Sequence, residues 1–387
     1  MSADGQGRVP FHVPYQTGRE RAYIDEVFER GAFAGNGPFS RRCEAWLAEH
    51  IGSARALMTH SCTGALELAA MLSGVGPGDE VLLPSYTFVA TATSVLRTGA
   101  TPVFCDIDAA TMNLDPADVE RRITAKTKAI VPVHYGGVGV DMPALQALAD
   151  AHGLMIWEDA AQGLGASRGG RTLGSIAPMA CLSFHETKNV HCGLAGALLI
   201  NDRALVDKAE IVWERGTNRQ QFFKGLVDKY SWVEMGSSFY PSELQTAFLL
   251  AQLEGLGDDL AVRRRVWAAY AAGLADLVAA GHIEAMTLPD DVEGNGHLFW
   301  IRLPTAEMAD AVRERCRERG VITVIHYVPL HTSKVGRSLG GADGQLPVTE
   351  DCAPRLLRLP MFHGLTDADV ARVLEVVHDV VGEVVGG

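Results

Sequence analysis

The sequence predicts an α/β protein with two lobes: a large domain built on a mainly parallel sheet, and a smaller C-terminal α+β domain. Residues 55–200 alternate short apolar, β-branched runs with longer segments of helical period, as in a parallel sheet covered by helices on both faces. At 387 residues the chain is longer than the roughly 250–300 residues at which single cores stop growing. Hydrophobic residues make up 47% and charged residues 21%, a balance typical of a folded protein with a large core.

The elements of the large domain follow from this alternation. We expect strands at residues 54–59, 80–84, 101–106, 129–134, 154–158, 180–184 and 197–201. Helices are expected between them at residues 63–72, 90–98, 116–123 and 142–152. The last of these helices is entered through Asp141, an N-capping residue type, and ends before Gly153.

We place the domain boundary near residue 256, giving a large domain of residues 1–256 and a small domain of residues 257–387. Within the large domain, residues 210–240 turn polar and aromatic, with no clear core face, and are expected to form an arm of the kind that often reaches a partner subunit. Helices rich in Leu and Ala are expected at 242–256 and 259–280. The small domain is expected to contain strands at 298–303 and 322–327 and helices at 306–319 and 367–381.

Composition also excludes several classes of protein. The net charge of −13 argues against nucleic acid or an anionic membrane as a general partner, because both favour a basic surface. The seven cysteines are scattered without a paired CxxC pattern, so we expect reduced thiols and no metal site. The opening MSADGQGRVPFHVP lacks the pattern of a secretory leader, and no run of about 18 apolar residues occurs, so a cytoplasmic location is expected.

An acid and a lysine are predicted to emerge from neighbouring strand ends, where open α/β sheets bind their ligands. Asp159 directly follows the strand at 154–158, and Lys188 follows the strand at 180–184 in the string SFHETK. Pyridoxal phosphate (PLP) chemistry requires such a pair: a lysine that forms an imine with the cofactor, and a carboxylate that keeps its pyridine nitrogen protonated. Taken singly, a loop lysine is usually a solvated surface residue, and an Asp after a buried strand often caps a helix.

A third element strengthens this interpretation. After the strand at 54–59 the chain reads HSCTGA, a run of small residues that opens a helix and could hold a phosphate through Cys62 and Thr63. Taken alone, this pattern is more often explained by helix capping through Ser61 or Thr63, and because capping and phosphate binding coexist in one geometry the pattern does not separate them. Ser183 offers a further hydroxyl near Lys188, and Phe88 follows a strand where an aromatic ring can stack on a cofactor, although a Phe there is more often part of the core.

Several long strings, in order, are similar to those of the DegT/DnrJ/EryC1/StrS sugar aminotransferases, which have the PLP-dependent aspartate-aminotransferase-like (type I) fold. They are PSYTFVATA (84–92), VPVHYGGVGVDM (131–142), EDAAQG (158–163), SFHETKN (183–189) and GTNRQQFFKG (216–225). The strings GPFSRRCEAWL (37–47), DKYSW (228–232) and GSSFYPSELQ (236–245) resemble the branch that aminates dTDP-4-keto-6-deoxyglucose at C4. The resemblance runs from about Gly35 to Phe362.

The resemblance implies roles for individual residues. Lys188 matches the imine lysine, Asp159 the partner of the pyridine nitrogen, and Gln162 the residue beside the ring hydroxyl. The other matches are the stacking Phe88, the phosphate-loop residues Cys62 and Thr63, and the phosphate-binding Ser183. Two strings depart from the family pattern: Gly193-Leu194-Ala195-Gly196 stands where GEGG is usual, and Gly236-Ser-Ser-Phe-Tyr240 stands where a GYNYR-like string crosses from the partner subunit.

The implied reaction moves an amino group from L-glutamate to the C4 ketone of a dTDP-4-keto-6-deoxyhexose, giving a dTDP-4-amino-4,6-dideoxyhexose, with PLP and pyridoxamine phosphate as cofactor forms. A homodimer with its active site at the subunit interface is also expected. Candidates for binding the nucleotide sugar are Asn218, Arg219, Lys224, Lys229 and Tyr230 in the arm, with His326 and Tyr327 in the small domain. A solvated charged loop and structural hydrogen bonding are the competing interpretations of these residues.

Three alternatives remain at this point. The catalytic residues do not distinguish a C4 from a C3 aminotransferase that acts on a 3-keto nucleotide sugar. A PLP-dependent sugar dehydratase is disfavoured by Lys188, because histidine replaces the lysine in the related dehydratases. A non-catalytic or regulatory protein of the same fold is disfavoured by the intact set of Lys188, Asp159 and Gln162.

Overall fold

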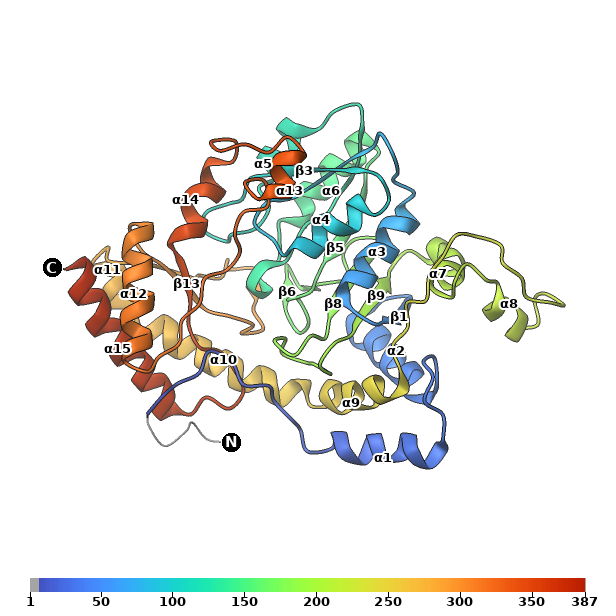
Figure 1. The fold of residues 1–387 in the computed structure, drawn as a ribbon, viewed down its shortest axis with the longest axis horizontal. Helices are drawn as coiled ribbons and strands as arrows, with labels where there is room; N and C mark the ends of the chain where they lie inside the picture. Colours follow the sequence, from blue (N-terminus) through green and yellow to red (C-terminus); the bar gives the residue numbers. More distant parts are fainter. Residues whose placement is uncertain (1–6, 387) are drawn as a thin grey trace.

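The computed structural model describes residues 7–386 (Figure 1). Residues 1–6, the start of the stretch in which no leader is expected, and Gly387 lie outside the described part. Within that part, none of the helices combines the length and the apolar character needed to cross a membrane.

A seven-stranded sheet forms the centre of the molecule, and all seven strands expected from the sequence are confirmed. They are β1 (Arg55–Thr59), β2 (Glu80–Pro84), β3 (Thr101–Cys105), β4 (Thr127–Ile130), β5 (Met155–Asp159), β8 (Met179–Ser183) and β9 (Gly196–Ile200). Their spatial order is β1-β9-β8-β5-β4-β2-β3, and only β9 runs antiparallel to its neighbours. The mainly parallel α/β fold is therefore confirmed, and the carboxyl ends of six strands meet at one edge.

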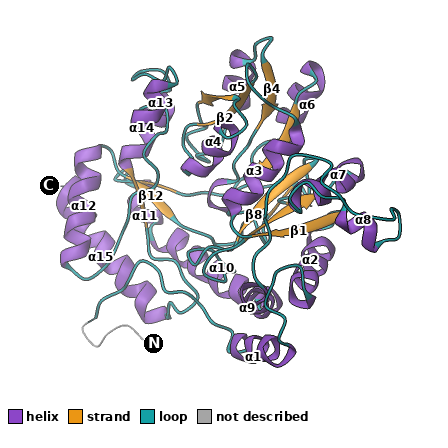
Figure 2. Cartoon of the chain, turned by 45° about the vertical axis from the view of Figure 1, so that its right-hand side comes forward, coloured by secondary structure: helices purple, strands orange, loops and turns teal. Residues whose placement is uncertain are grey.

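Helices cover both faces of this sheet (Figure 2). Successive residues of a strand point to opposite faces, so Leu57 and Leu198 pack under one group of helices while Ala56 and Ala197 pack under the other. The first group contains α3 (Cys62–Ser73), α4 (Val89–Leu96) and α7 (Val206–Trp213). The second contains α2 (Pro38–Ile51), α5 (Pro116–Arg122), α6 (Met142–His152) and α9 (Glu243–Glu254).

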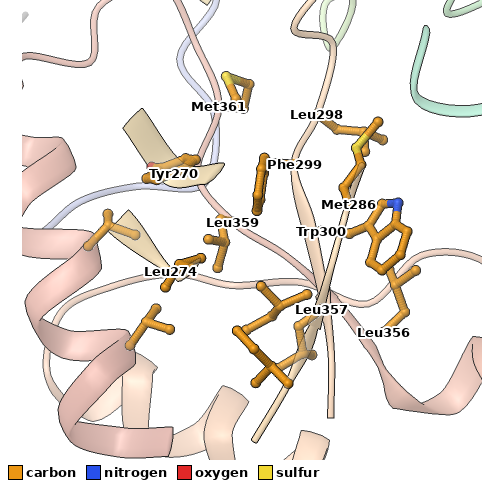
Figure 3. Packing of buried hydrophobic residues seen from close by; sticks show 14 of the residues in the cluster. Tyr270, Leu274, Met286, Leu298, Phe299, Trp300, Leu356, Leu357, Leu359 and Met361 are labelled. Carbon is orange, nitrogen blue, oxygen red and sulfur yellow. The ribbon is translucent and has the colours of Figure 1, made fainter. Parts of the chain in front are cut away.

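The C-terminal part of the chain builds a second core around a small antiparallel sheet. Its strands are β10 (Glu284–Ala285), β12 (Trp300–Arg302) and β13 (Leu356–Arg358), in the order β10-β12-β13. Figure 3 shows Phe299, Trp300 and Leu357 packed together in this core. The surrounding helices are α10 (Leu256–Gly273), α11 (Ala275–Ala279), α12 (Ala306–Glu318), α14 (Pro347–Arg355) and α15 (Asp367–Val385). The short helix α13 (Lys334–Ser338) lies instead beside the central sheet, where the adjacent Leu339 packs against its core. A further small sheet joins β6 (Ser167–Arg168), β7 (Arg171–Thr172) and β11 (Val292–Glu293).

Two expectations for the C-terminal part are wrong in detail. The strand expected at 322–327 is a single bridge between Val324 and Arg358. The backbone beyond Val324 makes its hydrogen bonds with the segment after β2 instead. The Tyr86 hydroxyl donates to the His326 carbonyl, and the Leu330 N–H donates to the Ser85 carbonyl. The single helix expected at 259–280 is divided into α10 and α11, with the break directly after Gly273, a poor helix former.

The N-terminal segment contains a helix and a strand pairing that the sequence pattern does not predict. Helix α1 (Glu20–Arg30) packs against α9, and Val9 pairs with Val321 beside the C-terminal core. The segment between them carries Phe11 and His12 to the edge of the central sheet, where the candidate site lies.

Candidate active site

Lys188 lies on the loop that joins β8 to β9. The loop is closed at its base by hydrogen bonds from the Phe184 N–H to the Ala195 carbonyl (2.9 Å) and from the Cys192 N–H to the Phe184 carbonyl (3.1 Å). Burial lowers the pKa of the Lys188 amine, and the nearby charge of Arg358 lowers it further, against the opposing effects of Cys62 and Asp159. The amine therefore becomes neutral, and able to accept a proton, at a lower pH than a surface lysine.

Asp159 is the last residue of β5 and is buried. The Thr91 hydroxyl donates to its Oδ2 at 2.8 Å, and the Ala161 N–H donates to its Oδ1 at 3.2 Å. Burial raises the pKa of this carboxyl, while the two hydrogen bonds and the charge of Lys188 act in the opposite direction. A buried carboxylate of this kind favours a cationic partner beside it.

The amino terminus of α3 lies against the start of β9. Ser61 caps the helix by accepting from the Gly64 N–H at 3.0 Å, which leaves the first-turn N–H groups of Cys62 and Thr63 without intrahelical partners. A Cβ on Gly196 would approach the Cys62 nitrogen to 2.5 Å, so only glycine allows β9 to pass this close. The start of α3 is therefore capped by the Ser61 side chain and still has free backbone N–H groups.

These elements enclose a cavity of about 440 Å³, within the usual range for small-molecule sites of about 300–1,000 Å³. All seven residues predicted to bind or act with the cofactor line it, as do two of the predicted substrate residues: Cys62, Thr63, Phe88, Asp159, Gln162, Ser183, Lys188, His326 and Tyr327. Leu194, from the string that departs from the family pattern, also lines the cavity and is half exposed. An apolar side chain therefore stands at a position where the family pattern has a carboxylate.

Aromatic residues form the wall on the side of the C-terminal core. Gln162 links this wall to the sheet by accepting from the Gly136 N–H at 2.6 Å and donating to the Tyr327 hydroxyl at 3.1 Å. The Tyr135 hydroxyl lies 3.0 Å from His326 Nδ1. Burial holds the pKa of His326 well below the usual histidine range, so its ring is neutral at pH 7.

The residues of the cavity or its support that sequence reasoning missed include Phe11, Thr91, His297 and Arg358. Thr91 reaches Asp159 across 68 positions of sequence, a contact that periodicity does not reveal. Burial and the charge of Lys188 place the pKa of His297 well below its ordinary value, and its Nδ1 lies 2.8 Å from Asn189 Oδ1. Arg358 does leave a sequence signal, since it is the one charged residue in the run LLRLPMF.

Five predicted substrate residues do not reach this cavity within the chain. They lie on or around α8 (Arg219–Phe223), which projects from the body at the right of Figure 1. Arg219 pairs with Glu214 at 3.0 Å, and Lys224 pairs with Glu210 at 2.6 Å. Asn218 accepts from the Ser231 N–H at 2.7 Å, while Lys229 and Tyr230 are exposed.

The residues of the cavity fit PLP. A lysine amine with a lowered pKa, a buried carboxylate for a ring nitrogen, and unpaired N–H groups at a helix start are the three kinds of group that its aldehyde, pyridine and phosphate require. Lys188, Asp159 and the Cys62–Thr63 turn would hold these parts. Phe88, 58% exposed at the amino terminus of α4, offers a ring to stack on the cofactor.

A model of the DegT/DnrJ/EryC1/StrS aminotransferase family matches residues 14–378. A pleiotropic regulatory protein of Geobacillus stearothermophilus is 36% identical over 354 residues, 91% of each chain. The spore coat polysaccharide biosynthesis protein SpsC of Bacillus subtilis is 33% identical, covering 96% of this chain and 97% of its own.

Solved structures agree with this match. DesV of S. venezuelae is 34% identical with a TM-score of 0.88, over 97% of this chain and 98% of DesV. Spr1654 of Streptococcus pneumoniae, described as a sugar aminotransferase, is 25% identical to this chain. Its PLP form has a TM-score of 0.87 over 97% of this chain and 99% of its own. The same protein is also solved with pyridoxamine phosphate. The chain therefore belongs to the DegT/DnrJ/EryC1/StrS aminotransferase family and is a PLP-dependent enzyme of the type I fold.

Proposed function

We propose that the enzyme transfers an amino group from L-glutamate to the C4 ketone of a dTDP-4-keto-6-deoxyhexose, giving a dTDP-4-amino-4,6-dideoxyhexose. The observation that carries the amino-transfer part is the convergence of Lys188, Asp159 and Gln162 in one cavity at the strand ends. The nucleotide-sugar part is supported by the similarity to SpsC, a polysaccharide biosynthesis protein, and to Spr1654. The choice of C4 rests on the strings GPFSRRCEAWL, DKYSW and GSSFYPSELQ.

Lys188 carries the proton in both halves of this reaction. When bound, PLP supplies the electron sink that stabilises a carbanion at the donor's α-carbon. Lys188, whose pKa is lowered by burial, removes the proton from that carbon in its neutral form and in the second half delivers a proton to the sugar carbon. The negative charge of Asp159 favours a protonated ring nitrogen and so stabilises charge as it develops.

We further propose a homodimer in which the arm of one subunit reaches the cavity of the other. The arm's large apolar side chains support this, since Leu226, Trp232 and Met235 are each at least 66% exposed. Exposed apolar groups gathered on one projecting segment are typical of a protein interface. Arg219, Lys224 and Tyr230 would then lie close to the nucleotide sugar bound in the partner subunit.

The test is to incubate the holoenzyme with L-glutamate and a panel of 3-keto and 4-keto nucleotide sugars, and to determine the product by NMR. We expect an amine at C4 of a dTDP-6-deoxyhexose. An amine at C3 would replace the proposed regiochemistry with the C3 alternative, and no turnover with any ketosugar would overturn the function.

A regulatory role is a second candidate, favoured by one observation: a relative of 36% identity bears the name pleiotropic regulatory protein. The catalytic and the regulatory candidates differ in whether the holoenzyme catalyses amino transfer. Conversion of the aldehyde form of the cofactor to the amine form by glutamate, followed by its reversal on adding a ketosugar, would exclude a purely non-catalytic role.

A further inference from the structure

His331 joins two parts of the chain behind the wall of the cavity. Its Nδ1 lies 2.7 Å from the Ser85 hydroxyl, and its Nε2 lies 3.0 Å from Oε1 of Glu350. A carboxylate only accepts hydrogen bonds, so Nε2 donates to Glu350, and Nδ1 of the neutral ring accepts from Ser85. Ser85, His331 and Glu350 therefore form a hydrogen-bonded relay.

The relay has the residue types of a hydrolase triad, but its burial excludes that role. Ser85 and His331 are fully buried, and neither lines the cavity that contains Lys188. A serine nucleophile must reach the reacting carbon of a substrate, which this hydroxyl does not. The two ring nitrogens are also used in the reverse sense, since in the serine–histidine–aspartate triad Nε2 contacts the serine. The relay therefore acts within the protein.

The Ser85 end of the relay is attached to the central sheet. Ser85 follows β2, and its N–H donates to the carbonyl of Cys105 at the end of β3 (3.1 Å). Its Oγ accepts from the His331 N–H at 3.1 Å, and its carbonyl accepts from the Leu330 N–H at 3.0 Å. With the bond to Nδ1, three hydrogen bonds hold the Leu330–His331 backbone and ring against two adjacent strand ends.

The Glu350 end is anchored as well. Glu350 accepts from the N–H groups of Gly344 (2.7 Å) and Leu346 (3.0 Å) in addition to His331. Burial acts to raise the pKa of its carboxyl, but these hydrogen bonds outweigh burial and lower the pKa to about 2, so Glu350 is ionised at neutral pH. An ionised acceptor keeps the proton on Nε2 of His331 and leaves Nδ1 to accept from Ser85.

The relay lies between two stretches that line the cavity. On one side, Phe88 follows Ser85 by three positions; on the other, Tyr327 precedes His331 by four positions. The ring centres of Phe88 and Tyr327 are 6.4 Å apart, and the Tyr327 hydroxyl accepts from Gln162 at 3.1 Å. A change in the Ser85–His331 contact would therefore change the separation of two side chains of the site.

We propose that this relay positions His326 and Tyr327 for binding of the ketosugar, with His331 as the positioning residue. The inference rests on the function proposed above, in which these two side chains bind the nucleotide sugar. Displacing a substrate-contacting group by about 1 Å costs up to about 100-fold in rate, so the groups that hold it in place affect substrate binding. The loop of Lys188 is closed by its own hydrogen bonds, so the ketosugar step should depend on the relay more than the glutamate step does.

The experiment compares two substitutions of His331 that each keep one half of the relay. The amide oxygen of Asn takes the place of Nδ1 and accepts from Ser85, whereas the amide nitrogen of Gln takes the place of Nε2 and donates to Glu350. We expect the KM for the ketosugar to rise roughly tenfold in His331→Gln and less than about threefold in His331→Asn. The effect stays moderate because the Tyr86 hydroxyl still holds the His326 carbonyl.

Two further measurements show whether the effect passes through Ser85. The rate of the glutamate half-reaction, followed by the visible absorbance of the cofactor, should change less than about twofold in both His331 variants. Ser85→Ala should raise the KM for the ketosugar as much as His331→Gln does, and the double variant should be no worse than either single one, because both remove the same contact.

The controls are matched substitutions at exposed positions. Ser338→Ala alters a serine on α13, in the same segment of chain, whose hydroxyl donates only to the Val335 carbonyl of its own helix. His152→Gln alters an exposed histidine at the end of α6. Both variants should have the wild-type KM and the wild-type rate with glutamate. Melting temperatures of all variants would show which of them are folded in the assay.

The outcomes separate this inference from the function on which it rests. Wild type that aminates no ketosugar would overturn the proposed function. An unchanged KM for the ketosugar in both His331→Gln and Ser85→Ala, in enzyme that is otherwise active, would overturn the positioning role. Equal slowing of both half-reactions in His331→Gln and His331→Asn, with equally lowered melting temperatures, would also overturn it, by assigning the relay to stability alone.

Discussion

The cavity at the strand ends and the arm at residues 210–240 show two different ways of holding functional side chains. In the cavity, Asp159 ends β5 and Lys188 lies on the loop that follows the adjacent strand β8, and the chain itself provides their neighbours. In the arm, Arg219 and Lys224 lie on a projecting segment and pair with Glu214 and Glu210 of their own chain. The residues proposed to hold the cofactor are therefore brought together by the fold of one chain, whereas the proposed substrate role of the arm requires a second subunit.

The largest expected effect is the loss of the proton carrier. Lys188→Ala should reduce turnover by at least about 10³-fold, because a positioned general acid–base group contributes about 10²–10⁴-fold and Lys188 acts in both halves. Single-turnover absorbance measurements with glutamate would determine the rate. Lys126→Ala, which removes an exposed lysine, is the control and should keep wild-type activity; turnover retained by Lys188→Ala would contradict the assignment.

Asp159→Asn should reduce turnover by roughly 10²–10³-fold, the scale expected when one electrostatic contact to developing charge is removed. The amide keeps the shape and the Thr91 contact but loses the charge that favours a protonated ring nitrogen. Thr91→Val should have a smaller effect in the same direction, since it removes one hydrogen bond to an intact carboxylate. Equal turnover rates in wild type and Asp159→Asn would show that the charge of Asp159 plays no part in catalysis.

Glu158, next to Asp159 in β5, is expected to affect stability rather than chemistry. Its carboxylate is fully buried and accepts from His134 Nε2 (2.8 Å) and from the N–H groups of Gly174, Ile176 and Ala177 (2.7–2.8 Å). Burial alone would raise its pKa, but these hydrogen bonds outweigh burial and hold the pKa below 4.5. Glu158→Gln should lower the free energy of unfolding by about 2–4 kcal/mol, measured by denaturant titration.

The same pKa shift fixes the pH dependence of this stability difference. A carboxyl group whose pKa is lower in the folded state stabilises the protein above its unfolded pKa, about 4.5, and loses this effect as the pH falls through the folded value. The gap between wild type and Glu158→Gln should therefore be constant above about pH 5.5 and shrink in acid. If the difference in the free energy of unfolding between wild type and Glu158→Gln stayed the same down to the pH of acid unfolding, Glu158 would not be ionised in the folded protein.

The smallest effects are expected in the arm. Arg219→Ala should raise the KM for the nucleotide sugar roughly tenfold, as expected for a charge-assisted hydrogen bond to a phosphate. It should change the free energy of unfolding by less than about 1 kcal/mol, because the Arg219–Glu214 pair is partly exposed. Arg203→Ala, at an exposed position outside the arm, is the control. An unchanged KM in both Arg219→Ala and Lys224→Ala would remove the arm from the substrate site.

The sequence was most informative where local pattern and tertiary role coincide. Each strand of the central sheet is a short apolar run between turn signals, so its position and its end were predictable, and with them Asp159 and Lys188. The prediction of a strand at 322–327 was wrong because a β-branched run forms a strand only where a neighbouring strand is available for pairing. In this run only Val324 has such a pairing partner.

The parts of the site that were missed depend on contacts distant in sequence. Thr91 supports Asp159 through a packing of α4 against the end of β5 that no local pattern reveals. Arg358 is visible as a charge within an apolar run, but only the three-dimensional arrangement shows that it lines the cavity that contains Lys188.

The most direct test of the account is to reduce the holoenzyme with borohydride and locate the pyridoxyl group by peptide mass spectrometry. We expect the group to be attached to Lys188, the lysine that lines the cavity beside Asp159. Attachment to any other lysine, or an unmodified Lys188 in protein that has bound PLP, would contradict it.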